Sequence, residues 1–179
     1  MIRGYHFVGR TLRDGRPVPA DGEWLEHVGP LEMCQSGLHG CQHPFDALSY
    51  APGATLCLVD LDGEMIEQDD KIVARRRRIV QRMDATMLLW DAARASARDV
   101  LHLWPAPEVV RQYLATGDES LRTRAGAATR AAARDASWDA ARDAAWDAAR
   151  DAARDAAWAA QRDRFAVMVT AAFASLERA

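Results

Sequence analysis

Polar and apolar residues alternate with the period of a β-strand in several stretches of the first 83 residues. The segment 3–8 alternates in this way, and Ala54–Leu61 is an apolar run of strand length that is rich in Leu and Val. We expect a turn at Asp62-Gly63 to close this run, and a further strand to extend over Lys71–Val80. A short helix is expected over Pro44–Ala51, because proline is favoured in the first turn of a helix.

From Asp84 onward the apolar residues recur with the period of an α-helix. One apolar stripe extends from Leu89 to Trp104, and Pro105 ends that helix. A second, short helix is predicted to end at Gly117, after which another begins and continues toward the carboxyl end. Unbroken, this last helix would measure about 90 Å at 1.5 Å per residue, so we expect at least one break in it.

A four-residue unit repeats between Arg134 and Arg162, with Asp-Ala-Ala preceded by Arg or Trp in most copies. Alanine is the strongest helix former, and the Asp and Arg residues stand at the i, i+3 spacing that lets opposite charges meet. Successive tryptophans point in different directions on such a helix, which favours a helix surrounded by several neighbours. The aromatic residues that we expect to bind a partner or to pack between helices are Trp90, Trp104, Trp138, Trp146, Trp158, Phe165 and Phe173.

These patterns predict an α+β protein with two domains. A small β-rich domain with one helix would occupy residues 1–83, and an all-α, alanine-rich helical region would occupy residues 84–179. The net charge of −3 is shared almost evenly between the two parts, so neither resembles a nucleic-acid-binding or membrane-binding arm. No apolar run approaches the roughly 20 residues of a membrane span, and we expect a cytoplasmic protein without a cofactor.

The densest group of reactive side chains lies between residues 34 and 43. Cys34, His39, Cys41 and His43 are residue types that bind zinc, but the six residues between the two cysteines depart from the usual spacing of zinc ligands. Buried thiols beside a hydrogen-bonded histidine are the favoured interpretation, and ligand binding is a further alternative. The run Arg75–Arg78 could be an anion-binding patch, but the favoured interpretation is an edge strand or a strand solvated on both sides, with a structural role rather than phosphate binding.

The first 82 residues resemble a domain of unknown function that is found in bacterial and phage proteins. The resemblance rests on the pattern Cys-x2-Gly-x-His-x-Cys-x2-Pro-x-Asp-Ala-Leu-x-Tyr from Cys34 to Tyr50, followed by Asp62-Gly63-Glu64 and Lys71–Ala74. It implies a domain boundary and no particular mechanism.

The remainder of the chain is similar to alanine-rich helical immunity proteins of bacterial toxin systems. This similarity rests on Leu88–Arg94, on Asp99–Trp104 and on the end of the repeat, Gln161–Phe165. It implies a helical module that binds a toxin and has no catalytic activity.

Together these features predict a non-enzymatic protein of immunity or host–phage conflict type that acts through its helical half. The expected partner is another protein or a further copy of the chain, since alanine-faced helices bury little area and a homo-oligomer would supply the missing core. The alternative is an enzyme, because Gly4–Val8 and Gly37–His39 also resemble the nicotinamide-binding strands of ADP-ribosyltransferases. That resemblance implies that His6 holds a ribose, Tyr50 stacks on nicotinamide and Glu64 stabilises the developing positive charge.

Overall fold

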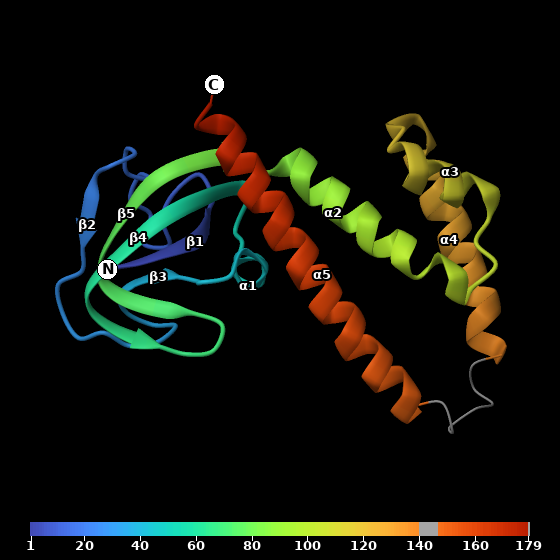
Figure 1. Ribbon diagram of the computed structural model, residues 1–179, viewed down its shortest axis with the longest axis horizontal. Coiled ribbons are helices and arrows are strands. Elements are labelled where there is room, and N and C mark those ends of the chain that lie inside the picture. Colours follow the sequence, from blue (N-terminus) through green and yellow to red (C-terminus); the bar gives the residue numbers. More distant parts are fainter. Residues whose placement is uncertain (140–146, 179) are drawn as a thin grey trace. The chain divides into compact units, whose positions relative to one another are not determined.

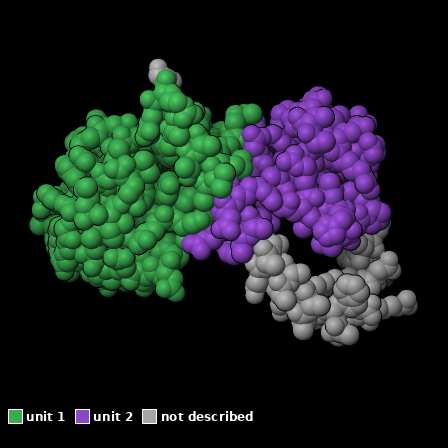
Figure 2. Space-filling model, viewed as in Figure 1, with its two compact units in different colours: residues 1–89, 165–179 green, residues 90–164 purple. Residues whose placement is uncertain are grey.

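The computed structural model describes the backbone of residues 1–139 and 147–178, and the side chains of residues 1–132 and 158–178. The strands lie between residues 2 and 84 and the long helices between residues 86 and 176, so the predicted α+β fold is confirmed (Figure 1). Two compact units are present (Figure 2). Unit 1 consists of Met1–Leu89 and Phe165–Ala179, and unit 2 of Trp90–Arg164.

Unit 1 is built on one antiparallel sheet of five strands. Its order is β1 (Ile2–Val8), β4 (Thr55–Glu67), β5 (Ile72–Asp84) and β2 (Trp24–Glu26), while β3 (Leu38–Gly40) also pairs with β5. The longest strands, β4 and β5, pair along most of their length and form the centre of the sheet. Strand predictions for residues 3–8, 54–61 and 71–80 are therefore confirmed in kind, although β4 and β5 are longer than expected.

The sheet closes on itself through a contact between the end of β3 and β1. The backbone of Tyr5 exchanges two hydrogen bonds with that of Cys41, at N···O distances of 2.7 and 2.9 Å. Because β3 also pairs with β5, the strands β1, β4, β5 and β3 form a small closed ring. A side chain on Gly4 would prevent this approach, since a Cβ atom there would lie 2.8 Å from the Cys41 carbonyl oxygen.

A hydrophobic core cluster of unit 1 is built mainly on the two central strands. Cys57, Val59 and Leu61 of β4 are fully buried, and the cluster continues through Ile72, Ala74 and Ile79 of β5. Facing residues of an antiparallel pair lie on the same side of the sheet, so Ile79, which faces Val59, points to the same side as that buried residue.

The end of helix α5 (Asp147–Leu176) belongs to unit 1. Phe165 is 1% exposed and meets the ring of Phe45 edge-on, with 5.9 Å between ring centroids. Phe173 is also buried, and its ring lies 6.5 Å from that of Tyr5. Both aromatic residues thus pack against the β-rich unit, whereas their sequence position groups them with the helices.

The turn predicted at Asp62-Gly63 is wrong, because β4 continues to Glu67. The pairing of β4 with β5 is shifted between Asp62 and Met65, and Gly63 has φ = 79°. The glycine is therefore used in a β-bulge, which also requires a conformation that other residues rarely adopt. The hairpin turn lies further on, where the Gln68 amide donates to the Lys71 carbonyl at 2.9 Å.

The edge position predicted for Arg75–Arg78 is also wrong. Strand β5 pairs with β4 on one side and with β2 and β3 on the other, so the four arginines lie in an interior strand. Arg76 and Arg78 flank the ring of Trp24, with distances of 5.1 and 4.9 Å to its centroid. Arg78 also donates to the buried carboxylate of Asp60 at 2.9 Å. The predicted structural role thus holds for this pair of arginines.

Unit 2 contains most of the helical region. Helix α2 (Thr86–Asp99) enters it, a short 3-10 helix follows at Leu101–Leu103, and α3 (Glu108–Thr116) and α4 (Glu119–Asp139) continue the chain. Its described core consists of Val110, Leu114 and Ala125, with Trp104 packed against them.

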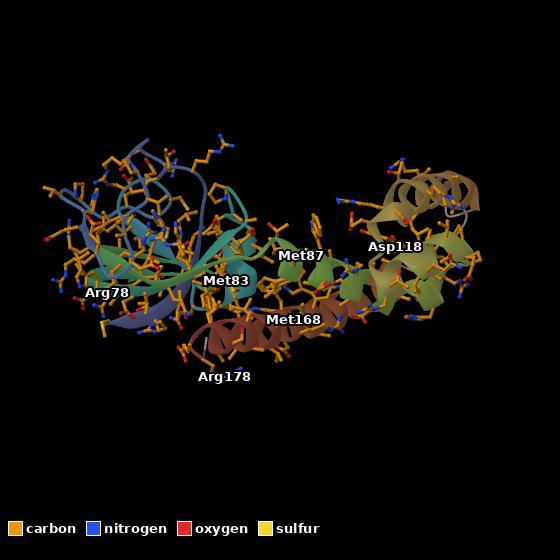
Figure 3. The ribbon with its side chains drawn as sticks, turned by 90° about the horizontal axis from the view of Figure 1, so that it is seen from above. Arg78, Met83, Met87, Asp118, Met168 and Arg178 are labelled. Atoms are coloured by element: carbon orange, nitrogen blue, oxygen red, sulfur yellow. The ribbon has the colours of Figure 1, made fainter. Side chains whose placement is uncertain are left out.

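The ends of these helices follow the predicted signals. Gly117 ends α3 in a left-handed conformation with φ = 68°, and the Asp118 carboxylate accepts a hydrogen bond from the Ser120 amide at the start of α4 (Figure 3). The described parts of the final helical region end at Asp139 and resume at Asp147. Residues 140–146, and with them any break of the helix between these two parts, lie outside the described part of the chain. Across the described residues, no helix is both long and apolar enough to cross a membrane.

Candidate functional site: a cationic cavity in unit 1

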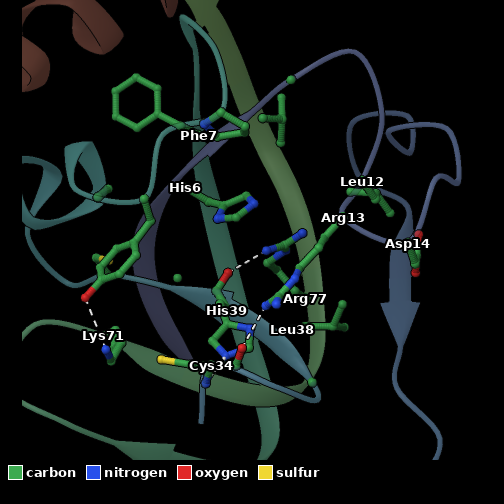
Figure 4. A pocket seen from close by; sticks show the side chains of 18 of the residues that line it. His6, Phe7, Leu12, Arg13, Asp14, Cys34, Leu38, His39, Lys71 and Arg77 are labelled. Carbon is green, nitrogen blue, oxygen red and sulfur yellow. Dashed lines mark hydrogen bonds between the residues drawn. The ribbon is translucent and has the colours of Figure 1, made fainter.

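A cavity of about 1040 Å³ lies within unit 1 beside β1 and β3 (Figure 4). It is lined by residues 5–14, which form β1 and the loop after it, and by residues 34–41, which lead through β3 to the bridge with β1. The remaining lining residues are Arg16, His27, Ala47, Tyr50, Pro52, Lys71 and Arg77. The contact between β1 and β3 therefore creates the wall that carries most of the polar side chains.

The central cation of the cavity is Arg77. Its neighbour across the strand pair is the core residue Leu61, so its side chain points to the inner face of the sheet and is only 4% exposed. Nη1 donates a hydrogen bond to the carbonyl oxygen of His39. No carboxylate among the described residues forms an ion pair with Arg77, whereas most other arginines of the sheet have such a partner. Burial lowers the pKa of Arg77 to about 10, so the group remains charged at neutral pH.

A second arginine approaches from the loop after β1. The exposed Arg13 donates through Nη1 to the carbonyl oxygen of Cys34 at 2.7 Å. The amide of Cys34 in turn donates to Nε2 of His39 at 3.0 Å, which leaves the ring proton of neutral His39 on Nδ1. The backbone of one short segment thus positions both Arg13 and Arg77, and Figure 4 shows their guanidinium groups together beside His6 and His39.

Burial and the nearby positive charge hold the two histidines neutral. Burial, followed by the positive charge of Arg77, keeps the pKa of His6 well below 6.5. Burial and Arg77 also lower the pKa of His39. The only carboxylate among the lining residues, Asp14, is paired with Arg16 at 2.7 Å. The cavity therefore carries a net positive charge and disfavours further cations.

An aromatic ring stands at another part of the lining. Tyr50 follows helix α1 (Pro44–Leu48), is 46% exposed and donates its hydroxyl proton to Asp70. Lys71 donates to the Tyr50 hydroxyl at 3.1 Å, and its Nζ atom lies 5.0 Å from the ring centroid. Lys71 is itself balanced by Asp70, at 3.9 Å. The Tyr50 ring is thus fixed by contacts at its hydroxyl.

The cysteine and histidine residues considered as metal ligands occupy different surroundings. Cys34 and His39 line the cavity, and so does the buried Cys41, whose pKa is raised to about 12 by burial. His43 lies outside the lining and caps α1, with Nδ1 accepting from the Phe45 amide at 3.2 Å. Within the described part of the chain, no group of three or more His, Cys, Asp or Glu side chains is arranged to hold a metal ion.

The three residues of the ADP-ribosyltransferase alternative are only partly brought together. His6 and Tyr50 both line the cavity. Glu64 lies outside the lining, on β4, where its carboxylate accepts from Arg75 Nη2 at 2.5 Å.

The aromatic residues of the helical region also lie in different surroundings. Arg122 lies 5.3 Å from the Trp90 ring centroid, and Trp104 packs on the core of unit 2. Trp158 is 54% exposed. The side chains of Trp138 and Trp146 lie outside the described residues.

Arg77 was considered from the sequence only as part of a less favoured anion patch at Arg75–Arg78, and Arg13 was not considered at all. A signal for Arg77 was present, because an arginine two residues before the apolar Ile79 shares its face of a strand. The signal for Arg13 was absent, since a polar loop residue carries no periodicity.

Comparison with known proteins gives one match. No curated protein and no solved structure matches the chain. The model of one protein family matches residues 2–91, half of the 179 residues, and covers all five strands and the whole cavity lining. The chain therefore belongs to the family described as "Domain of unknown function (DUF7666)".

Proposed function

We propose that this protein is a binding protein whose unit 1 cavity holds an anionic small molecule. The observation that carries the proposal is the buried guanidinium of Arg77, which faces the cavity and has only a backbone carbonyl as its described partner. A buried charge without a counter-charge is costly, and a bound anion would remove that cost.

The other charges of the lining support the same function. His6 and His39 are neutral, and the one lining carboxylate is already paired, so nothing in the lining competes with a bound anion for Arg77. Low-dielectric walls strengthen the attraction between a cation and an anion relative to water. The volume of about 1040 Å³ is sufficient for an organic molecule of ordinary metabolite size.

The test is a binding titration of the purified full chain with a panel of organic phosphates and carboxylates in an anion-poor buffer. The variant Arg77→Met removes the buried charge and keeps an unbranched side chain of similar length. Arg124→Met removes the same charge from the exposed surface of α4 and serves as the matched control. We expect at least tenfold weaker binding for Arg77→Met and unchanged binding for Arg124→Met. Equal affinities of both variants and the unmodified chain would refute the proposal.

The enzymatic alternative is tested in the same experiment by including NAD⁺ in the panel. His6 and Tyr50 in the lining favour it, but Glu64 is paired with Arg75 outside the cavity. Binding without consumption of NAD⁺ supports a binding protein. Release of nicotinamide that is lost in Glu64→Gln would support the ADP-ribosyltransferase alternative.

A second candidate function concerns unit 2, where large apolar side chains are exposed. Leu103 is 70% and Trp158 is 54% exposed, and an exposed tryptophan is typical of protein-binding surfaces. We propose that this region mediates contacts with a protein partner, of which self-association is the simplest case. Static light scattering across a concentration series of the full chain tests it, with Trp158→Gln as the variant. A mass that stays monomeric throughout would refute self-association.

A further inference from the structure

We propose that Arg13 and Arg77 form a clamp for the phosphate group of an organic phosphate monoester. This inference rests on the proposed function and names the chemical class of the anion. It is drawn from the way the two guanidinium groups are held and from the charges around them.

The two arginines are positioned by a single framework. Arg77 donates to the His39 carbonyl and Arg13 donates to the Cys34 carbonyl, while the Cys34 amide donates to His39 Nε2. One backbone segment therefore holds both cations, although Arg13 comes from the loop after β1 and Arg77 from β5. Each guanidinium uses Nη1 for its carbonyl, so further N–H groups of both side chains remain for a ligand. Such a site loses little side-chain freedom on binding.

The charge of this pair matches a dianion. Two other cations of the lining have carboxylate neighbours, with Asp14 beside Arg16 and Asp70 beside Lys71, while Arg10 is exposed. Arg13 and Arg77 have described contacts to carbonyl oxygens instead, which leaves two positive charges to be balanced. A phosphate monoester carries about −1.5 to −2 charges at pH 7 and three acceptor oxygens, whereas a carboxylate carries −1 and two oxygens. Arginine also binds phosphate through two parallel hydrogen bonds.

The size and lining of the cavity indicate that the phosphate is attached to an organic group. A cavity of about 1040 Å³ far exceeds the volume of inorganic phosphate. Its lining includes Phe7, Leu12, Leu38 and Pro52 as apolar surface, and the fixed ring of Tyr50 offers a stacking partner. The ligand therefore combines a phosphate with an apolar or ring-bearing body.

The test compares phenyl phosphate with benzoate, because both probes carry the same ring and differ in the anionic group. Isothermal titration of the full chain in a buffer free of phosphate and sulfate is expected to give at least tenfold tighter binding of phenyl phosphate. The variant Arg13→Met should lose at least tenfold in affinity for phenyl phosphate and much less for benzoate. Arg124→Met is the matched control, since it removes a charge from an exposed residue of α4 that lies outside the cavity lining. It should change either affinity less than threefold.

The outcomes separate the two levels of the proposal. Benzoate that binds as tightly as phenyl phosphate, with both lost in Arg77→Met, would overturn the phosphate clamp and leave the anion site standing. Phenyl phosphate affinity that is unchanged in Arg13→Met would also overturn the clamp. Absence of binding of either probe at millimolar concentration, together with no binding of other anions, would overturn the proposed function itself. Arg13 is an exposed loop residue, so loss of folding is not expected for its variant.

Discussion

Replacement of Arg77 by methionine should make the protein more stable while it removes anion binding. Burial lowers the pKa of Arg77 from its ordinary value to about 10. At about 1.4 kcal/mol per pKa unit, keeping the group charged in the folded state costs roughly 3 kcal/mol. The unfolded state binds the proton more tightly, so this cost is present in full below pH 10 and declines only as the pH rises above 10.

The hydrogen bond from Arg77 to the His39 carbonyl offsets part of this cost. Hydrogen bonds of charged groups contribute about 1.5 to 3 kcal/mol, and the carbonyl can regain a water molecule from the cavity. A methionine side chain also adds favourable apolar burial beside Leu61. The net expectation for Arg77→Met is a gain of roughly 1 kcal/mol in the free energy of unfolding at pH 7. Such a gain with a loss of binding is typical of a residue kept for function.

The assay is hydrogen exchange of peptides from β4 and β5, measured by mass spectrometry at pH 7 in anion-poor buffer, because these strands form the core of unit 1. Arg75→Met is the control on the same strand. Arg75 is paired with Glu64 and donates to backbone carbonyls, so its removal should destabilise by about 1 kcal/mol. If Arg77→Met instead loses more than about 1 kcal/mol, the charge is already compensated within the fold, and the reasoning behind the anion site fails.

Three further predictions concern other parts of unit 1. Affinity for sulfate, which stays a dianion across this range, should rise as pH falls from 6.5 toward 5, because a bound anion raises the lowered pKa of His6 and binding then takes up a proton. Calorimetry in two buffers of different ionisation enthalpy measures this uptake, and absence of proton exchange would contradict the prediction. Iodoacetamide should alkylate the exposed Cys34 in the folded protein and spare the buried Cys41 and Cys57, whose pKa values are raised to about 12 and about 11. Peptide mapping measures the three rates, and equal rates would show that this part of unit 1 opens readily. Gly4→Ala should cost roughly 2 kcal/mol in a urea titration, because the added Cβ would lie 2.8 Å from a backbone oxygen, and unchanged stability would mean that β1 and β3 do not meet as described.

Local pattern was sufficient to predict the α+β class and most of the elements. Alternation placed β1, β4 and β5, and the helix signals at Gly117 and Asp118 marked the boundary between α3 and α4 correctly. These features depend on residues close in sequence, which is why periodicity and capping residues report them. The prediction of a turn at Asp62-Gly63 was wrong because the outcome there depends on residues distant in sequence. The same dipeptide suits a turn and a bulge, and only the pairing of β4 with β5 decides between them.

The local sequence pattern could not predict which side chains form the candidate site. His6, His39 and Tyr50 were named from the sequence. Arg77 was assigned to a solvated or edge strand, with anion binding as the less favoured alternative, and Arg13 was not considered. Their proximity depends on the bridge between β1 and β3 and on the interior position of β5, contacts between segments some 30 to 70 residues apart. The same holds for Phe165, which returns to unit 1 after the whole of unit 2.

The sequence by itself thus determined which segments are strands and helices and which side of each is apolar. The tertiary structure decided which apolar faces meet, which arginine loses its contact with water and where a cavity remains. The physical reason is that local conformation follows from nearby residues, whereas burial of a charge and the shape of a cavity are properties of several distant segments packed together.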